Sequence, residues 1–307
     1  MNATVVILLS TVVSLGGEPG RQLPYSEQEA FQFGAPRTVD IEIYGHDAQG
    51  AFVSHGAGSI LHEDGYILTC EHITVAGDRQ EVVLADGTSY PFTVLARAGG
   101  TFDTAVLRIT PKAPLPAMIL GHSKDVSVDE KIMVIGNPDG KRHAVKYGVV
   151  EKTSCGGGTQ IHVGKADVGP GDSGGPVINM FGQMVAQVHV KIFTLPQASR
   201  HIRVDHIRDA FATSLMDQAR GKYEIGLDVD CHAERAIVKS VVKDSPAAEA
   251  GIRVGDEITR FDAMNIRCGP HYVLALLDRV TDQPIALALK RGEQAIVATV
   301  KPRARAK

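Results

Sequence analysis

The segment GPGDSGGPV, residues 169–177, surrounds one aspartate and one serine with four glycines and two prolines. Glycine and proline at this density hold a backbone in shapes that other residues rarely adopt. Nucleophilic acyl transfer needs a reactive hydroxyl and backbone N–H groups that point at the developing oxyanion. We therefore interpret Ser173 as a nucleophile, with Gly171, Asp172 and Ser173 forming its oxyanion hole. The alternative is an ordinary glycine-rich turn.

A serine nucleophile requires a base and an acid elsewhere in the chain. His72 follows the apolar run GYILT at residues 65–69, and Asp103 precedes the apolar run TAVLRI at residues 104–109. Each residue taken alone is more typical of a strand end or a turn. Together, His72, Asp103 and Ser173 occur in the chain order of the chymotrypsin triad, so we predict that they meet in the fold.

Length and composition limit the functions that are plausible. A chain of 307 residues is long enough for two domains, and its 44% hydrophobic and 22% charged residues are ordinary for a globular protein. The formal net charge of −3 argues against nucleic acid as a partner. The apolar run at residues 3–15 is too short to span a bilayer and favours a secretory signal, although no Lys or Arg precedes it. A misassigned start or a buried strand is the alternative.

The chain changes character along its length. Between residues 37 and 195, short Val- and Ile-rich runs separated by turn sequences predict antiparallel sheets closed into barrels. A helix is expected at 204–220, followed by strands and a second helix between 223 and 303. Four cysteines would allow two disulfides in an oxidising compartment, with Cys231–Cys268 the more plausible pair, but unpaired thiols are equally consistent.

Several of these segments resemble one family. The runs at 56–72 (GAGSILHEDGYILTCEH), 102–109 (FDTAVLRI), 134–140 (VIGNPDG) and 166–188 are similar to the trypsin-like PDZ serine proteases of the HtrA/Deg family. The run VVKDSPAAEAGIRVGDEITRFDAMNI, residues 241–266, is similar to the core of that family's PDZ domain. The resemblance covers about residues 50 to 303.

The resemblance implies a mostly β fold, with a chymotrypsin-like double antiparallel β-barrel followed by an α+β PDZ domain. On this basis we expect six segments: a signal peptide at 1–20, an N-terminal arm at 21–36, the protease domain at 37–215, a linker at 216–222, the PDZ domain at 223–303 and a tail at 304–307.

The resemblance also implies functional roles. Ser173 is the expected nucleophile, His72 the general base and then acid, and Asp103 the residue that orients the imidazole. The activity implied is exported, periplasmic endoproteolysis of unfolded proteins without a metal or organic cofactor. A catalytically latent scaffold is the alternative. The PDZ domain would bind C-terminal peptides through a loop formed by Glu224, Ile225, Gly226 and Leu227.

The family resemblance further implies a homotrimer that contacts through N-terminal aromatic residues, here Phe31 and Phe33. An N-terminal arm that is only loosely packed is the alternative. No feature of the sequence chooses between the two.

The sequence departs from the family pattern near the nucleophile. Asp172 replaces the usual Asn, as in digestive trypsin-like enzymes, where that Asp pairs with a newly cut N-terminus. The strand that walls the specificity pocket is replaced by SRHIRV at 199–204. Asp167 lies where trypsin carries the aspartate that selects Arg or Lys. It either lines the substrate pocket or forms an ion pair with Arg200 or Arg203, and we expect the ion pair and cleavage after Val or Ala.

Overall fold

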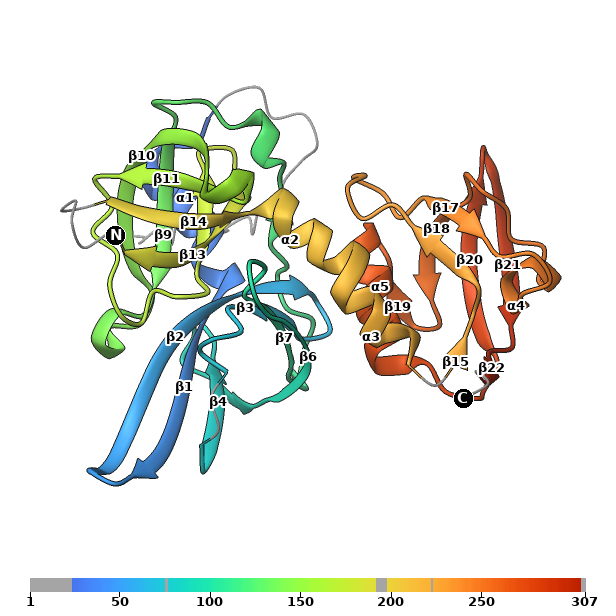
Figure 1. Cartoon of the computed structure of the whole chain (residues 1–307), viewed down its shortest axis with the longest axis horizontal. Helices are drawn as coiled ribbons and strands as arrows, with labels where there is room; N and C mark the ends of the chain where they lie inside the picture. Colours follow the sequence, from blue (N-terminus) through green and yellow to red (C-terminus); the bar gives the residue numbers. More distant parts are fainter. Residues whose placement is uncertain (1–23, 75–76, 192–197, 222, 305–307) are drawn as a thin grey trace, which may run out of the picture.

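The computed structural model describes residues 24–74, 77–191, 198–221 and 223–304. In Figure 1, two strand-rich units lie side by side at the N-terminal end, and a helix connects them to a third unit at the C-terminal end. This arrangement confirms the expected fold, which is mostly β and consists of a trypsin-like double barrel followed by a PDZ domain.

The first sheet contains seven antiparallel strands in the order β5-β4-β1-β2-β3-β7-β6. Alternate residues of β1, namely Val39, Ile41 and Ile43, point into one buried apolar cluster with Ile60 and Leu107. The strands are β1 (Thr38–Asp47), β2 (Gly50–His62), β3 (Tyr66–Thr69), β4 (Arg79–Val83), β5 (Ser89–Pro91), β6 (Thr93–Ala98) and β7 (Thr104–Arg108).

The second sheet follows the order β12-β9-β10-β11-β14-β13-β8, and a further pairing of β12 with β13 closes six of its strands into a barrel. Closure removes the sheet edges and encloses an apolar core that includes Ile132, Val134, Ile161 and Val177. The strands are β8 (Ile119–Leu120), β9 (Lys131–Gly136), β10 (Ala144–Cys155), β11 (Gln160–Gly164), β12 (Pro176–Asn179), β13 (Gln183–Lys191) and β14 (Ala198–Arg203).

The N-terminal arm carries a short helix, α1 (Glu27–Gly34), that packs on the second barrel. Phe33 is only 1% exposed, stacks on Tyr25 at 5.7 Å and lies under the guanidinium of Arg37. Phe33 is therefore not available for a contact between subunits, and this part of the trimer prediction is wrong. Phe31 is half-buried and packs on an apolar cluster that includes Ile135 and Ile178 of the second barrel.

The segment expected as a signal peptide lies outside the described residues. Among the residues that are described, no helix combines the length and the apolar character needed to cross a membrane.

One continuous helical segment leads from the second barrel to the C-terminal domain. It contains α2 (Val204–Ala210), a π-helical stretch (Phe211–Leu215) and α3 (Met216–Arg220). Met216 is 2% exposed and belongs to the core. The first five residues of the expected linker at 216–222 are thus helical, as predicted for residues 204–220, and Met216 and Ala219 of this helix are buried against the PDZ domain.

The C-terminal domain combines two helices with small sheets. Strand β16 pairs with β17, β15 pairs with β22, and the remaining strands form the order β19-β18-β20-β21. The elements are β15 (Tyr223–Glu224), β16 (Leu227–Val229), β17 (Val238–Val241), α4 (Pro246–Glu249), β18 (Glu257–Phe261), β19 (Met264–Asn265), α5 (Gly269–Arg279), β20 (Ile285–Arg291), β21 (Gln294–Val300) and β22 (Arg303–Ala304). The four cysteines are free thiols, so the disulfide between Cys231 and Cys268 is not formed.

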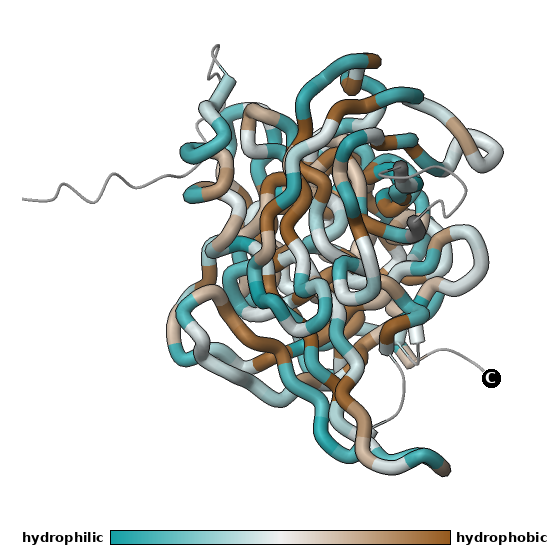
Figure 2. Tube along the Cα trace, turned by 90° about the vertical axis from the view of Figure 1, so that its left-hand side faces the viewer, coloured by the Kyte–Doolittle hydropathy of each residue, from teal (hydrophilic) through white to brown (hydrophobic). Residues whose placement is uncertain are grey.

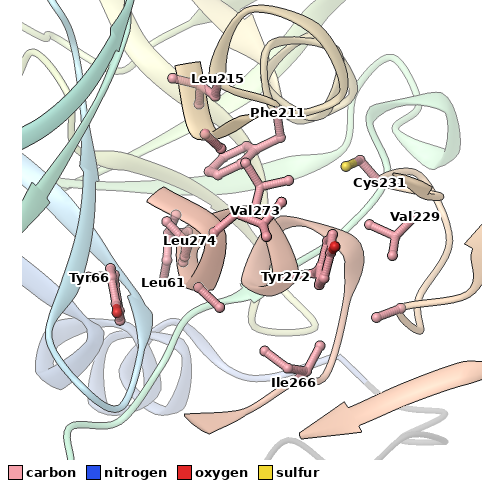
Figure 3. Close-up of a cluster of buried hydrophobic side chains, with 14 of the residues drawn as sticks. Leu61, Tyr66, Phe211, Leu215, Val229, Cys231, Ile266, Tyr272, Val273 and Leu274 are labelled. Atoms are coloured by element: carbon pink, nitrogen blue, oxygen red, sulfur yellow. The ribbon is translucent and has the colours of Figure 1, made fainter. Parts of the chain in front are cut away.

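The protease and PDZ domains share one apolar cluster. Figure 3 shows Leu61 and Tyr66 of the first barrel, Phe211 of the connecting helix and Leu274 of α5 around the same core. Figure 2 shows hydrophobic stretches running through the interior of the molecule. Buried His271 also contacts the carbonyl of Leu61 through Nε2 at 2.9 Å. These contacts make the relative position of the two domains part of the packed structure.

Candidate active site

His72 and Asp103 lie next to each other at the ends of two paired strands. His72 follows β3 and Asp103 immediately precedes β7, and these two strands pair in the first sheet. His72 Nδ1 is 2.6 Å from Asp103 Oδ2, and the backbone N–H of His72 donates to Asp103 Oδ1 at 2.9 Å. A carboxylate can only accept, so Nδ1 carries the proton and leaves Nε2 of the neutral ring as a base.

The carboxylate of Asp103 is buried and strongly hydrogen-bonded. Burial alone would raise its pKa, but the side-chain and backbone hydrogen bonds from His72 outweigh burial, and the pKa lies below its ordinary value. Its backbone φ of +38° is in the left-handed region, which aspartate adopts more readily than most residues. Asp103 therefore remains ionised and fixes the orientation of the imidazole.

A second histidine contacts the same carboxylate, and the sequence analysis did not find it. His189 Nε2 lies 3.3 Å from Asp103 Oδ2, while His189 Nδ1 lies 3.1 Å from the amide nitrogen of Gln160. Because the amide donates to Nδ1, the proton of the neutral ring is on Nε2, the ring nitrogen that lies near Asp103. Burial lowers the pKa of His189, which favours this neutral form.

The loop around Ser173 has the conformation that its glycines permit. Gly171 and Gly174 have φ of +93° and +85°. A Cβ on Gly171 would lie 2.1 Å from the carbonyl oxygen of Asn137, and one on Gly174 would lie 2.2 Å from Thr69 Oγ1. Side chains are excluded at both positions because the loop packs directly on its neighbours.

The backbone N–H groups of this loop are oriented differently from one another. Asp172 N–H donates to the carbonyl of Gly169 at 3.1 Å, and Gly174 N–H donates to the carbonyl of Val188 at 3.0 Å. For Gly171 and Ser173, no acceptor within the described part of the chain is recorded for the N–H. Gly171 and Ser173 therefore supply the N–H groups of the predicted oxyanion hole, whereas Asp172, also assigned to it, uses its own N–H within the loop.

The nucleophile candidate and the base candidate come from opposite barrels. Ser173 belongs to the second barrel, and its carbonyl accepts from the N–H of Ala57 in the first barrel at 2.9 Å. Gly174 packs on Thr69 and Cys70, which come shortly before His72 in the sequence. Among the described residues, no hydrogen bond links Ser173 Oγ to His72. Catalytic hydrogen bonds are often long without substrate and tighten in the Michaelis complex.

Cys70 lies beside His72 and Asp103, and one ligand atom from each residue falls within 4.8 Å of the others. Burial raises the pKa of the Cys70 thiol well above its ordinary value, so the sulfur is protonated and is a poor metal ligand. Its S–H donates to the carbonyl of Val188 at 3.2 Å. The cluster is therefore better suited to proton transfer than to metal binding.

The residues proposed for the substrate pocket lie on or next to strands of the second barrel. Asp167 is exposed. Arg203 contacts Asp205 at 3.8 Å and the carbonyl of Gly158 at 3.2 Å. Arg200 and Arg203 lie on β14, which pairs with β11 and β13. The ion pair of Asp167 with one of these arginines stays a prediction.

A cavity of about 310 Å³ lies in the PDZ domain at the predicted peptide loop. Its lining includes Glu224, Ile225, Gly226 and Leu227, together with Tyr272 and Leu276 of α5. Sequence analysis did not predict the third wall, which α3 supplies through Met216, Ala219 and Arg220. Arg220 pairs with Asp228 of β16 at 2.6 Å and so ties α3 to the rim of the cavity.

Comparison with known protein families agrees with the division into two domains. Residues 56–186 match the model of the trypsin-like peptidase domain, and residues 224–301 match the model of the PDZ domain. The first match includes His72, Asp103 and Ser173, and the second includes the cavity-lining loop.

The chain is also similar to characterised relatives. It is 26% identical over 302 residues to the serine protease HTRA1 of Xenopus tropicalis, covering 88% of this chain and 65% of that protein. It is 30% identical over 241 residues to a probable periplasmic serine endoprotease, DegP-like, of Brucella suis, covering 70% of this chain and 46% of that protein. The chain thus spans between about half and two thirds of these relatives.

Two solved structures have a similar fold. The crystal structure of the serine endoprotease from Yersinia pestis gives a TM-score of 0.53 at 23% identity and covers 93% of this chain and all of that one. The HtrA-type protease AlgW with a decapeptide gives 0.54 at 22% identity, covering 92% of this chain and 99% of that one.

Proposed function

Because this chain belongs to the HtrA family of serine proteases, with a trypsin-like peptidase domain and a C-terminal PDZ domain, we propose that it is a serine endopeptidase that cuts unfolded or damaged proteins. The observation that carries the proposal is the 2.6 Å contact of His72 with Asp103 in the first barrel. Ser173 and its two N–H donors belong to the second barrel, across the junction between the two.

The mechanism follows from these atoms. His72 Nε2 accepts the proton of Ser173 Oγ as that oxygen attacks the scissile carbonyl carbon, and Asp103 stabilises the imidazolium that forms. The N–H groups of Gly171 and Ser173 hold the oxyanion. The imidazolium then donates its proton to the leaving amine. Water, deprotonated by the same imidazole, attacks the acyl-enzyme, and the carboxylic acid product leaves Ser173 free.

The PDZ domain has a separate part in this proposal. A C-terminal peptide would add as a strand along β16, with its carboxylate against the loop at residues 224–227 and its last side chain in the 310 Å³ cavity. Tethering one end of an unfolded chain raises the effective concentration of its scissile bonds at Ser173.

The periplasmic relative and the apolar run at residues 3–15 support a further part of the proposal, export to an extracytoplasmic compartment, which mass spectrometry of the mature N-terminus tests. The proposal also includes the homo-oligomer that the family resemblance implies, in which the half-buried Phe31 remains the candidate contact. Sedimentation of the wild type and of Phe31→Ala tests this assembly.

An unfolded model protein is the appropriate substrate for the main test. The full chain should degrade it, Ser173→Ala should not, and mass spectrometry of the products identifies the residue before each cleavage. We expect Val and Ala there. A preference for Arg that disappears in Asp167→Ala would instead assign Asp167 to the pocket.

A catalytically latent scaffold is the second candidate function. Among the described residues, Ser173 Oγ makes no hydrogen bond to His72, and α3 lies along the PDZ cavity. Both observations favour a scaffold. In the same assay a scaffold would retain the unfolded protein intact in a stable complex. An endopeptidase would release fragments.

A further inference from the structure

Asp172 is a buried carboxylate directly before the candidate nucleophile, where the family pattern has a neutral Asn. The residue is 0% exposed. Its Oδ2 accepts a hydrogen bond from the N–H of Gly169 at 2.7 Å and forms an ion pair with the ammonium of Lys146. Its Oδ1 packs on Gly136, where a Cβ would come within 2.2 Å of it.

Burial raises the pKa of Asp172, and Lys146 opposes that rise. The carboxylate therefore depends on one cation. An ionised carboxylate that loses its partner in a dry site is strongly disfavoured and must either take up a proton or move to water.

Lys146 reaches Asp172 because of strand register in the second barrel. It lies on β10 opposite Val134 of β9, two residues before the Gly136 on which Asp172 packs. The Lys146 side chain is 18% exposed, so its stem is largely covered while its ammonium stays near the surface. Lys146 is thus held by a strand, and it meets Asp172, which is part of a loop.

We propose that Lys146 is a positioning residue that holds the backbone of residues 171–173 in the conformation that binds the oxyanion. This inference rests on the proposed endopeptidase function. Asp172 stands between the two N–H donors and is fully enclosed, with Oδ1 against Gly136, so its carboxylate can reach water only if the backbone of residues 171–173, which carries the Ser173 N–H, also shifts. In digestive trypsin-like enzymes, a newly cut N-terminus supplies the positive charge that pairs with this Asp. In this chain the ammonium of Lys146 on β10 supplies that charge, so the oxyanion hole forms without cleavage of the chain.

The test compares kcat and KM of the full chain on an unfolded model protein. Lys146→Met should lower kcat about 100-fold with little change in KM, which is the cost of losing one oxyanion donor. Lys146→Arg should keep kcat within about tenfold, because the guanidinium retains the charge. Lys152→Met, on the same strand but exposed and away from Asp172, is the matched control and should behave as the wild type.

A double variant separates positioning from a general loss of packing. In Lys146→Met/Asp172→Asn no buried charge lacks a partner, so most of the kcat lost in Lys146→Met should return. Asp172→Asn alone should have a mild effect, because Lys146 can turn its ammonium to water. Thermal unfolding of every variant is measured alongside, and Asp172→Asn and the double variant keep the test valid if Lys146→Met does not fold.

The results distinguish the two proposals. An inactive wild type would refute the endopeptidase function itself. An active wild type with kcat of Lys146→Met within twofold of normal would refute the positioning role alone. A double variant as inactive as folded Lys146→Met would also refute it, because the loss would then come from Lys146 itself and not from the unpaired carboxylate.

Discussion

Removal of the His189 side chain should slow the chemical step without weakening substrate binding. His189 Nε2 lies 3.3 Å from Asp103 Oδ2, the same oxygen that His72 Nδ1 contacts at 2.6 Å. His189 lies one residue after Val188 and does not contact Ser173 in the described residues. Its effect should therefore act through Asp103 and appear in kcat.

The geometry sets the expected size of that effect. A well-formed hydrogen bond to a charged group contributes about 1.5–3 kcal/mol, and a contact of 3.3 Å lies just beyond the usual N–H···O distance, so we use the lower value. A loss of about 1.5 kcal/mol corresponds to roughly a tenfold change in rate. We expect His189→Ala to lower kcat about tenfold at unchanged KM. His189→Gln can present an amide N–H near the position of Nε2 and should recover part of the loss.

Steady-state kinetics on an unfolded model protein measures this, with exposed His46→Ala as the control. The reasoning is refuted if folded His189→Ala keeps kcat within twofold of the wild type. It is refuted equally if His189→Gln loses as much as His189→Ala, because the loss would then reflect packing and not the contact of Nε2 with Asp103.

Three further predictions follow from packing, backbone geometry and protonation. Phe211→Ala removes a fully buried ring from the core shared by the two domains, so denaturant unfolding should show a loss of about 3–5 kcal/mol; no loss would contradict a shared core. Gly226→Ala places a Cβ 2.1 Å from Ser245 at a φ of +83°, so titration calorimetry should show weaker binding of a C-terminal peptide, while unchanged affinity would place the site elsewhere. The pKa of Asp103 in the native state is below the ordinary 3.8, so its ionised form stabilises the fold above that pH and this contribution is lost as pH falls below about 4. Denaturation below pH 4 should therefore show a smaller loss of stability for Asp103→Asn than for the wild type, and equal losses would be inconsistent with the pairing.

The sequence predicted those features that depend on local backbone requirements. The glycines at 171 and 174 indicated a turn that only glycine permits, and both have positive φ. The alternation of apolar residues predicted strands that end at His72 and begin after Asp103. Those two ends meet because β3 and β7 are neighbours in an antiparallel sheet.

The missed features depend on register between distant strands. Lys146 lies in a strand of alternating polar and apolar residues, a pattern that predicts an exposed side chain at this position. Only its pairing opposite Val134 of β9 brings it to Asp172. Asp172, in place of the family's Asn, was a usable signal for such a partner, because a buried carboxylate needs a cation. His189 carried no comparable signal, since its contact with Asp103 joins residues 86 positions apart on different barrels.

The error in the N-terminal arm has a similar origin. Phe33 was assigned to a contact between subunits because an N-terminal aromatic has no local pattern that distinguishes an internal from an external partner. The chain buries it on its own second barrel instead, against Gly182 between β12 and β13. The helix predicted at residues 204–220 is present, and α5 offers an apolar surface to Met216 and Ala219 that composition alone does not show.

Covalent labelling with a fluorophosphonate tests the central claim most directly. The hydroxyl of Ser173 should be reactive because the His72 imidazole removes its proton beside two N–H donors. Mass spectrometry of the labelled protein should find the phosphonyl group on Ser173, and labelling should be abolished in His72→Ala. An unlabelled Ser173 in the folded protein, or labelling at the same rate without His72, would contradict the account.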